Sequence, residues 1–225
     1  MAEYTKVFTA NEFATGMKSL PFTIAGSEYN NTMPRNCLYC ISYDSAIGKG
    51  IYSADCWNLI KSYIWSRGVL PVRAGDYIYN PGLYGLGDWN GRQILDVCTD
   101  VSNNFTHSKM QAGEYLLTQA EDHAGIYVGE FTSNWNGQLY TWNVIEATPI
   151  WSDGIQATYV DEQGRRFNHK GGEQRGAWYY HGKLPYVDYT NSEKKTDGIS
   201  FFIGDEINIK WVNAKTIEIK KGAKK

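Results

Sequence analysis

Three residues that lie far apart in the sequence could together form a nucleophilic site: Cys56, His123 and Glu146. A thiol hydrolase needs a thiolate, an imidazole within reach of it, and a polar group that fixes the imidazole tautomer. Each residue also has a structural interpretation: a buried cysteine, a hydrogen-bonded histidine and a solvated glutamate. The elements that carry the three residues therefore decide between the two interpretations.

A helix is predicted from about residue 53 to residue 68, with Cys56 in its first turn. Ser53 or Asp55 can cap its N-terminus, and Gly68 followed by Pro71 marks its end. Unpaired N–H groups and the helix dipole favour a thiolate in a first turn. The apolar face recurs at helical spacing and comprises Cys56, Leu59, Ile60, Tyr63 and Ile64.

A β-hairpin is predicted to bring His123 near Glu146. His123 begins a strand that ends at residue 129, and Glu146 lies near the end of a returning strand over 139–147. If the two residues pair directly, their side chains share one face of the sheet, and residues 130–139, with an Asn-Gly turn, form the connecting loop.

The remaining pattern predicts an α+β protein with a β-rich second half. We expect a short helix that begins at residues 9–11 and ends before Pro21, and another over 92–101. Residues 161–175 read as a polar loop. Further strands are predicted over 114–118, 154–160 and 176–180, and two more in FFIGDEINIK and WVNAKTIEIKK.

The other cysteines and histidines carry weaker signals. Cys37 and Cys40 form a lone CxxC without a second ligand pair, so we interpret them as structural, with a labile disulfide as the alternative and no metal site. His107, His169 and His181 lie in polar or turn-like segments, which predicts a surface position for each. Any of them could replace His123 in the hypothesis.

Composition restricts the class of protein. The 225 residues have a net charge of −2, which gives no broad basic surface for nucleic acid. No apolar run is long enough for a membrane helix, and the N-terminus lacks a secretory signal pattern, so we expect synthesis in the cytoplasm. Residues 191–225 contain 8 Lys and 5 acidic residues, whereas the rest of the chain is acidic overall.

Five motifs, in this order, resemble the NlpC/P60 peptidoglycan hydrolases: Asp55-Cys56-Trp57-Asn58-Leu59, Gly68-Val-Leu-Pro71, Gly113-Glu-Tyr-Leu, His123-Ala-Gly-Ile-Tyr-Val-Gly129 and Val144-Ile-Glu-Ala147. The resemblance covers roughly residues 8–190. It implies a papain-like α+β fold in which N-terminal helices, with the nucleophile at a helix start, pack on a central antiparallel sheet.

The resemblance also assigns roles to residues. Cys56 would be the nucleophile, His123 the base and Glu146 the orienting group, although histidine is commoner at this last position. Tyr43, Asp55 and Trp57 would lie near the oxyanion hole and the substrate, and no cofactor or metal is implied. Trp57-Asn58 replaces the family's Ser-Gly, and Glu114 replaces its Asp.

The expected function is therefore that of an endolysin-type hydrolase of bacterial peptidoglycan stem peptides. The resemblance implies cleavage of the γ-D-glutamyl–diamino acid bond by a monomer that acts on the cell wall after release. We expect a peptidase domain over 1–190 and a linker with a basic segment over 191–225, which loosely resembles the start of an SH3-like wall-binding module. Three alternatives stay open: a CHAP-like N-acetylmuramoyl-L-alanine amidase, a contact-delivered antibacterial effector, and a non-catalytic wall-binding module.

Overall fold

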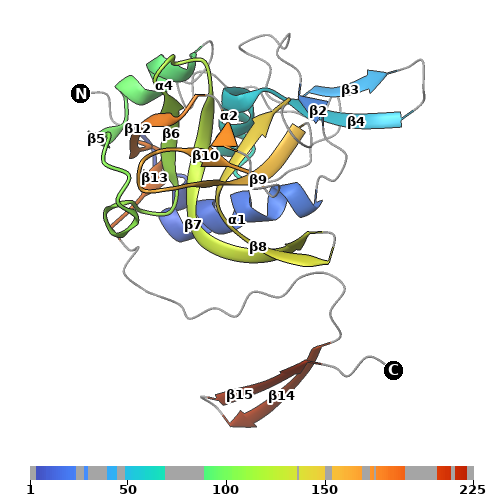
Figure 1. Cartoon of the computed structure of the whole chain (residues 1–225). Helices are drawn as coiled ribbons and strands as arrows, with labels where there is room; N and C mark the ends of the chain where they lie inside the picture. The colour runs from blue at the N-terminus through green and yellow to red at the C-terminus, as the bar shows by residue number, and fades with distance from the viewer. Residues whose placement is uncertain are drawn as a thin grey trace. The chain divides into compact units, whose positions relative to one another are not determined.

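The computed structural model describes residues 4–23, 28–29, 40–44, 49–68, 89–135, 137–149, 154–168, 173–174, 176–190, 207–213 and 216–221. The chain divides into two compact units, Met1–Glu193 and Lys194–Lys225. The first unit is α+β, with few helices and a mostly antiparallel sheet (Figure 1). None of the helices in the described ranges is long and apolar enough to cross a membrane.

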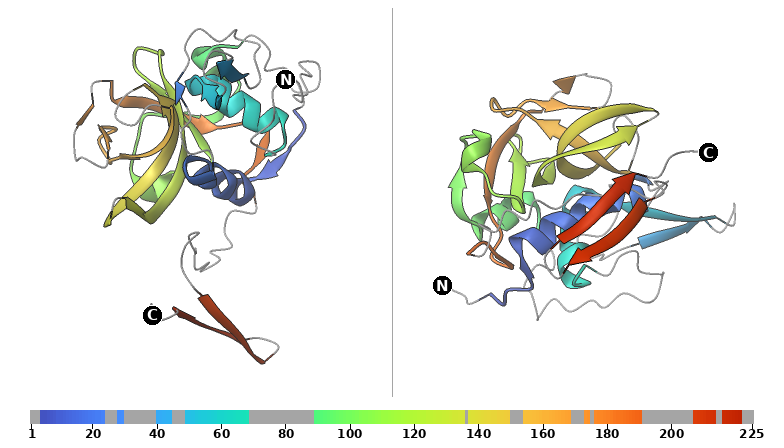
Figure 2. Two further views of the ribbon diagram at one scale, coloured as in Figure 1. Left: turned by 90° about the vertical axis from the view of Figure 1, so that its right-hand side faces the viewer. Right: turned by 90° about the horizontal axis from the view of Figure 1, so that it is seen from below.

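Two longer helices pack on the sheet. Helix α1 spans Ala10–Thr23 and α2 spans Cys56–Trp65, and both lie against the same side of the sheet (Figure 2, left). The predicted apolar face of α2 is buried, and so are Phe13, Met17 and Leu20 of α1. Pro21 does not end α1 as expected, because the helix continues through it to Thr23. A shorter helix, α4, spans Gly91–Asp96, and a 3-10 turn, η1, spans His107–Lys109.

The main sheet has eight strands in the order β11-β10-β9-β8-β7-β6-β12-β5, and every neighbouring pair is antiparallel. The longest pairing in the sheet is the central β7–β8 hairpin. The strands are β5 (Thr99–Ser102), β6 (Glu114–Thr118), β7 (Ala124–Trp135), β8 (Gln138–Thr148), β9 (Gly154–Val160), β10 (Arg166–Phe167), β11 (Glu173–Gln174) and β12 (Trp178–Lys183).

Smaller pairings complete the two units. A parallel pair joins β1 (Phe8–Thr9) to β13 (Val187–Asp188), and β4 (Lys49–Ala54) lies between β2 (Glu28–Tyr29) and β3 (Cys40–Asp44). In the second unit, β14 (Ile207–Asn213) and β15 (Thr216–Lys221) form an antiparallel hairpin.

Both faces of the sheet are buried, because alternate residues of β7 enter different apolar clusters. Ala124, Ile126 and Val128 pack with α1 and α2 in the larger cluster. Tyr127 points to the opposite face, where the smaller cluster also contains Val144 and Trp178. This alternation follows the period of two along a strand, and it separates the helix-packed face from the face that holds Glu146.

The β7–β8 hairpin differs from the predicted one in length and register. Residues 130–135 and 138–139 belong to the strands rather than to a loop, and Trp135 pairs with Gln138. Glu146 pairs with Gly125, which is two residues from His123. The register shifts between Tyr127 and Phe131, where a β-bulge interrupts the ladder. A two-residue shift leaves every side chain on its expected face.

Two further expectations from the sequence were wrong. The predicted helix over 92–101 ends at Asp96, and Thr99–Ser102 instead form the edge strand β5. The segment 161–175 is not simply a loop, because Arg166–Phe167 pair with β9 and extend the sheet. Both errors concern short strands, whose stability comes from pairing with a neighbour rather than from a local pattern.

Candidate active site

Cys56 is the first residue of α2, and the cap of this helix fixes its position. Asp55 has extended backbone geometry, and its Oδ1 accepts from the backbone N–H of Asn58 at 2.6 Å. Its Oδ2 accepts from the Asn58 side chain at 2.8 Å. Asp55 is thus the N-cap, a role that an aspartate fills well because its oxygen satisfies an otherwise unpaired donor.

The thiol of Cys56 lies next to the start of β7. Backbone N–H groups of Ala124 and Trp57 lie within hydrogen-bonding reach of its Sγ and favour the thiolate. Burial opposes them, as does the neighbouring Asp55 carboxylate, and together they raise the pKa of Cys56 to about 12. The prediction of a thiolate stabilised by the helix start was therefore wrong, since Cys56 is only 1% exposed and burial outweighs the helix terminus.

His123 immediately precedes β7 and is held by the turn that follows β6. Its backbone N–H donates to Thr118 Oγ1 at 3.2 Å, and its carbonyl accepts from the Thr118 N–H at 3.1 Å. Thr118 Oγ1 in turn donates to Asp122 Oδ1 at 2.8 Å. These contacts order the backbone on both sides of the imidazole, so that its direction depends on one compact turn.

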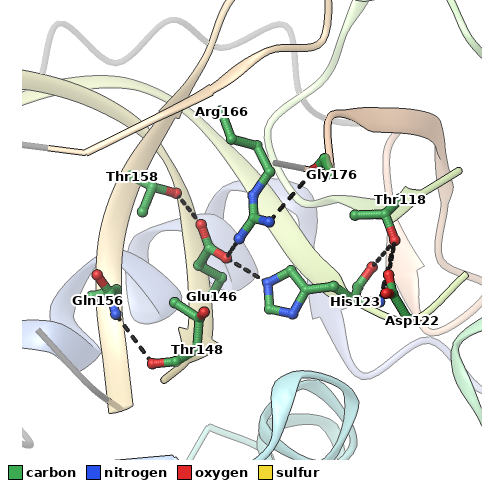
Figure 3. A network of polar contacts seen from close by, with 9 residues as sticks. All are labelled: Thr118, Asp122, His123, Glu146, Thr148, Gln156, Thr158, Arg166 and Gly176. Atoms are coloured by element: carbon green, nitrogen blue, oxygen red, sulfur yellow. Dashed lines mark hydrogen bonds and ion pairs between the residues drawn. The ribbon is translucent and has the colours of Figure 1, made fainter. Parts of the chain in front are cut away.

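Glu146 orients the imidazole from the neighbouring strand β8 (Figure 3). His123 Nε2 lies 2.5 Å from Glu146 Oε2, and Thr158 Oγ1 donates to the other carboxylate oxygen at 2.5 Å. The second ring nitrogen points away from Glu146, toward the teal helix α2 in Figure 3. It is therefore the nitrogen that is available to take a proton from a thiol at the start of that helix.

Glu146 is ionised although it is fully buried. Burial alone would raise its pKa, but the Arg166 cation, the contact with His123 and the Thr158 hydroxyl outweigh it and hold the pKa at about 2. Arg166 Nη2 contacts Oε2, the same oxygen that His123 contacts. A buried carboxylate requires such charged and hydrogen-bonded partners.

Trp178 packs against both His123 and Arg166, the two side chains that contact Glu146 Oε2. Its ring stacks on the imidazole of His123 at 5.4 Å with 28° between the planes. The Arg166 guanidinium lies 4.7 Å from the Trp178 ring centre. The indole therefore fixes the imidazole plane from one side while Glu146 fixes its direction in that plane.

The structure brings together only part of the predicted site. The thiol of Cys56 lies next to the backbone of Ala124, the residue that follows His123, and Glu146 contacts His123, whereas Asp55 acts as the helix cap. Trp57 is half-buried beside Cys56 and packs against the larger cluster. Tyr43 belongs to β3, opposite Gly50, but its side chain lies outside the described residues, as do Cys37 and the side chain of Cys40.

Among the other histidines, the surface prediction fails for His181. It is 4% exposed, its Nδ1 lies 2.6 Å from Glu114 Oε2, and its Nε2 lies 3.0 Å from the Asn104 carbonyl. Its interactions are thus already used within the fold, away from Cys56. His107 is half-buried near Glu130, and His169 lies outside the described residues.

Sequence reasoning missed Arg166, Thr158 and Trp178. Arg166 sits beside a second arginine in a polar segment, and nothing in the sequence distinguishes the buried one from its exposed neighbour. Thr158 reads only as a β-branched strand residue. A buried acidic residue on a predicted strand nevertheless implies partners, and the Val-Ile-Glu-Ala motif carries that signal.

In the described part of the chain, no three His, Cys, Asp or Glu side chains converge as metal ligands would. The arrangement instead has the parts of nucleophilic catalysis: a thiol at a helix start, an imidazole, and a buried carboxylate behind it. No protein-family model, no curated protein and no solved structure matches the chain.

Proposed function

We propose that the protein is a papain-like cysteine peptidase of the NlpC/P60 type that cleaves peptidoglycan stem peptides at the γ-D-glutamyl–diamino acid bond. One observation carries the proposal: His123, whose next residue Ala124 has its backbone at the Cys56 thiol, is oriented by a buried and ionised Glu146. The resemblance of the five sequence motifs supplies the substrate class. The proposal needs no cofactor or metal, and the wall polymer is its only required partner.

The resting site holds a protonated Cys56, because burial raises the pKa of this thiol to about 12. His123 therefore acts as a general base: it takes the thiol proton as Sγ attacks the carbonyl carbon of the scissile bond. Glu146 stabilises the imidazolium that forms. The backbone N–H of Cys56 is positioned at the start of α2, where no intrahelical acceptor exists for it, and would bind the oxyanion, whereas the N–H of Asn58 is used by the Asp55 cap.

The imidazolium then donates its proton to the leaving amine, and a thioester to Cys56 remains. A water molecule, deprotonated by the same imidazole, attacks the thioester and restores the thiol. Each proton removed from a nucleophile is returned to a leaving group, so the cycle closes without net proton uptake by the site.

One observation favours a second candidate of another class, a wall-binding module without catalysis. Cys56 is almost fully buried, and a buried cysteine with a raised pKa is commonly an inert packing residue. In such a module the ionised Glu146 would serve only to hold its strand against β9 and β10. Binding to wall polymer would then survive the loss of Cys56, and no bond would be cut.

Mass spectrometry of soluble fragments from purified peptidoglycan separates these functions. The proposal predicts fragments with new D-glutamate carboxyl ends and new amino ends on the diamino acid. Free L-alanine amino ends would assign the protein to the amidase class. Binding to the wall without any fragments would refute hydrolysis and favour the binding module.

A further inference from the structure

One oxygen of Glu146 contacts two side chains. Its Oε2 contacts both Nε2 of His123, at 2.5 Å, and Nη2 of Arg166. Glu146 is fully buried and Arg166 is 3% exposed, so solvent screens the interaction between them only weakly. The carboxylate that orients His123 therefore also has a permanently charged partner, and the two contacts share one oxygen.

Arg166 contacts the Gly176 carbonyl and the Trp178 ring as well as Glu146. Nη1 donates to the Gly176 carbonyl at 3.5 Å, and the guanidinium lies over Trp178, the ring that stacks on His123. Its Nε has no acceptor among the described residues, so the side chain is not held by a full set of neutral hydrogen bonds. The contact with Glu146 is the charged one that retains it.

Counting protons in this cluster shows what the arginine does. Without Arg166, the negative charge of the buried Glu146 carboxylate would be balanced by a His123 imidazolium while Cys56 is still a thiol. That form holds two protons on the Cys–His pair and cannot attack. With Arg166 present, the carboxylate is already neutralised, and a second proton would leave a net buried positive charge.

We propose that Arg166 is a positioning residue that limits the Cys56–His123 pair to one proton, the state competent for attack. The inference rests on the proposed function and deepens it. The titratable groups on the elements next to His123 are Cys56 and its preceding cap residue Asp55 at the start of α2, Asp122 in the turn before β7, Glu146 on β8 and Arg166 on β10. Among the described residues, Arg166 is the one Lys or Arg side chain that contacts the orienting carboxylate.

The pH dependence of Cys56 alkylation tests the proposal. Iodoacetamide reacts with the thiolate, and peptide mapping by mass spectrometry separates Cys56 from the other three cysteines. In Arg166→Met the acidic limb of the alkylation rate is expected to move up by about 1 to 3 pH units, the effect of removing a charge at this range. In Glu146→Gln, where Arg166 is left without its carboxylate, the limb is expected to move down.

Two further variants control for charge and position. Arg166→Lys keeps the charge and is expected to keep the wild-type limb, which a loss of packing alone would not explain. Arg165→Met removes the adjacent arginine, which is half exposed and pairs with Asp161. It is expected to change nothing. An unmoved limb in Arg166→Met, or a shift in the same direction as in Glu146→Gln, would overturn the proposal.

If Arg166→Met does not fold, the double variant Arg166→Met/Glu146→Gln decides, because it leaves no buried charge unpaired. The acidic limb of its Cys56 alkylation rate is expected at higher pH than in Glu146→Gln alone, because Arg166 is absent only in the double variant. Acidic limbs at the same pH in the two variants would refute the role of Arg166. The alkylation assay uses no wall substrate, so its outcome is separate from that of the proposed function. The same shifts are expected in the acidic limb of kcat/KM for wall hydrolysis.

Discussion

Acid sensitivity of folding follows from the buried carboxylate of Glu146. Its pKa falls from an ordinary value of 4.5 to about 2 in the folded protein. A group whose folded pKa is depressed stabilises the fold above its unfolded pKa and loses that contribution as the pH falls through the folded value. At about 1.4 kcal/mol for each pKa unit, the full contribution of Glu146 is about 3 kcal/mol.

Most of this contribution disappears between about pH 5 and about pH 2.5, where we expect a loss of about 2 kcal/mol from this single residue. Urea unfolding at both pH values, with wild type and Glu146→Gln, measures it. The glutamine variant should be less stable than wild type at about pH 5, because Arg166 loses its charged partner. Its free energy of unfolding should nevertheless fall by about 2 kcal/mol less than that of wild type between the two pH values.

A matched control separates Glu146 from general acid effects. Glu130 lies on β7 of the same sheet with a side chain that is 54% exposed, so Glu130→Gln should keep the wild-type pH dependence. If Glu146→Gln and wild type lost equal stability between the two pH values, the assignment of Glu146 as an ionised buried group would be wrong.

Three other substitutions test separate parts of the structure. Asp55→Ala removes the N-cap of α2 and should lower the free energy of unfolding in urea by about 1 kcal/mol. Asp55→Asn keeps a cap oxygen but removes the charge, so it should lower the pKa of Cys56 in a thiolate absorbance titration. His181→Leu leaves Glu114 buried and unpaired, so it should lower the free energy of unfolding by about 3 to 5 kcal/mol. The double variant Glu114→Leu/His181→Leu should recover much of that loss, and equal losses in the two variants would contradict a buried pair. Gly125→Ala places a methyl group 2.9 Å from the Trp178 ring. It should lower the free energy of unfolding by about 1 to 3 kcal/mol, seen as a lower melting temperature, and should also lower the rate of Cys56 alkylation.

The sequence predicted the helix that carries Cys56 because its signals are local. A cap residue, an apolar period of 3.6 and a terminating glycine all lie within sixteen residues, and the buried face agrees with the prediction. The strand that begins near His123 was found for the same reason. A thiolate was predicted wrongly, since burial depends on what packs against the thiol and not on the residues beside it in the chain.

The hairpin register and the partners of Glu146 could not be predicted locally. The bulge between Tyr127 and Phe131 shifts the pairing, and no residue in the Asn-Gly turn encodes that shift. Arg166 comes from a two-residue strand that is defined by its pairing with β9 and β11. The sequence therefore indicated that His123 and Glu146 share a face, while the third charge of the cluster required the sheet to be assembled.

The central claim is that Cys56 is the nucleophile of a wall hydrolase, and the most direct measurement is fragment release from peptidoglycan by single-cysteine variants. Cys56→Ala is compared with Cys98→Ala, which changes a partly buried cysteine just after the C-terminus of α4, hydrogen-bonded to the Ile94 carbonyl. The account predicts release of D-glutamate-ended fragments by wild type and Cys98→Ala and none by Cys56→Ala. Undiminished release by a folded Cys56→Ala protein would contradict it.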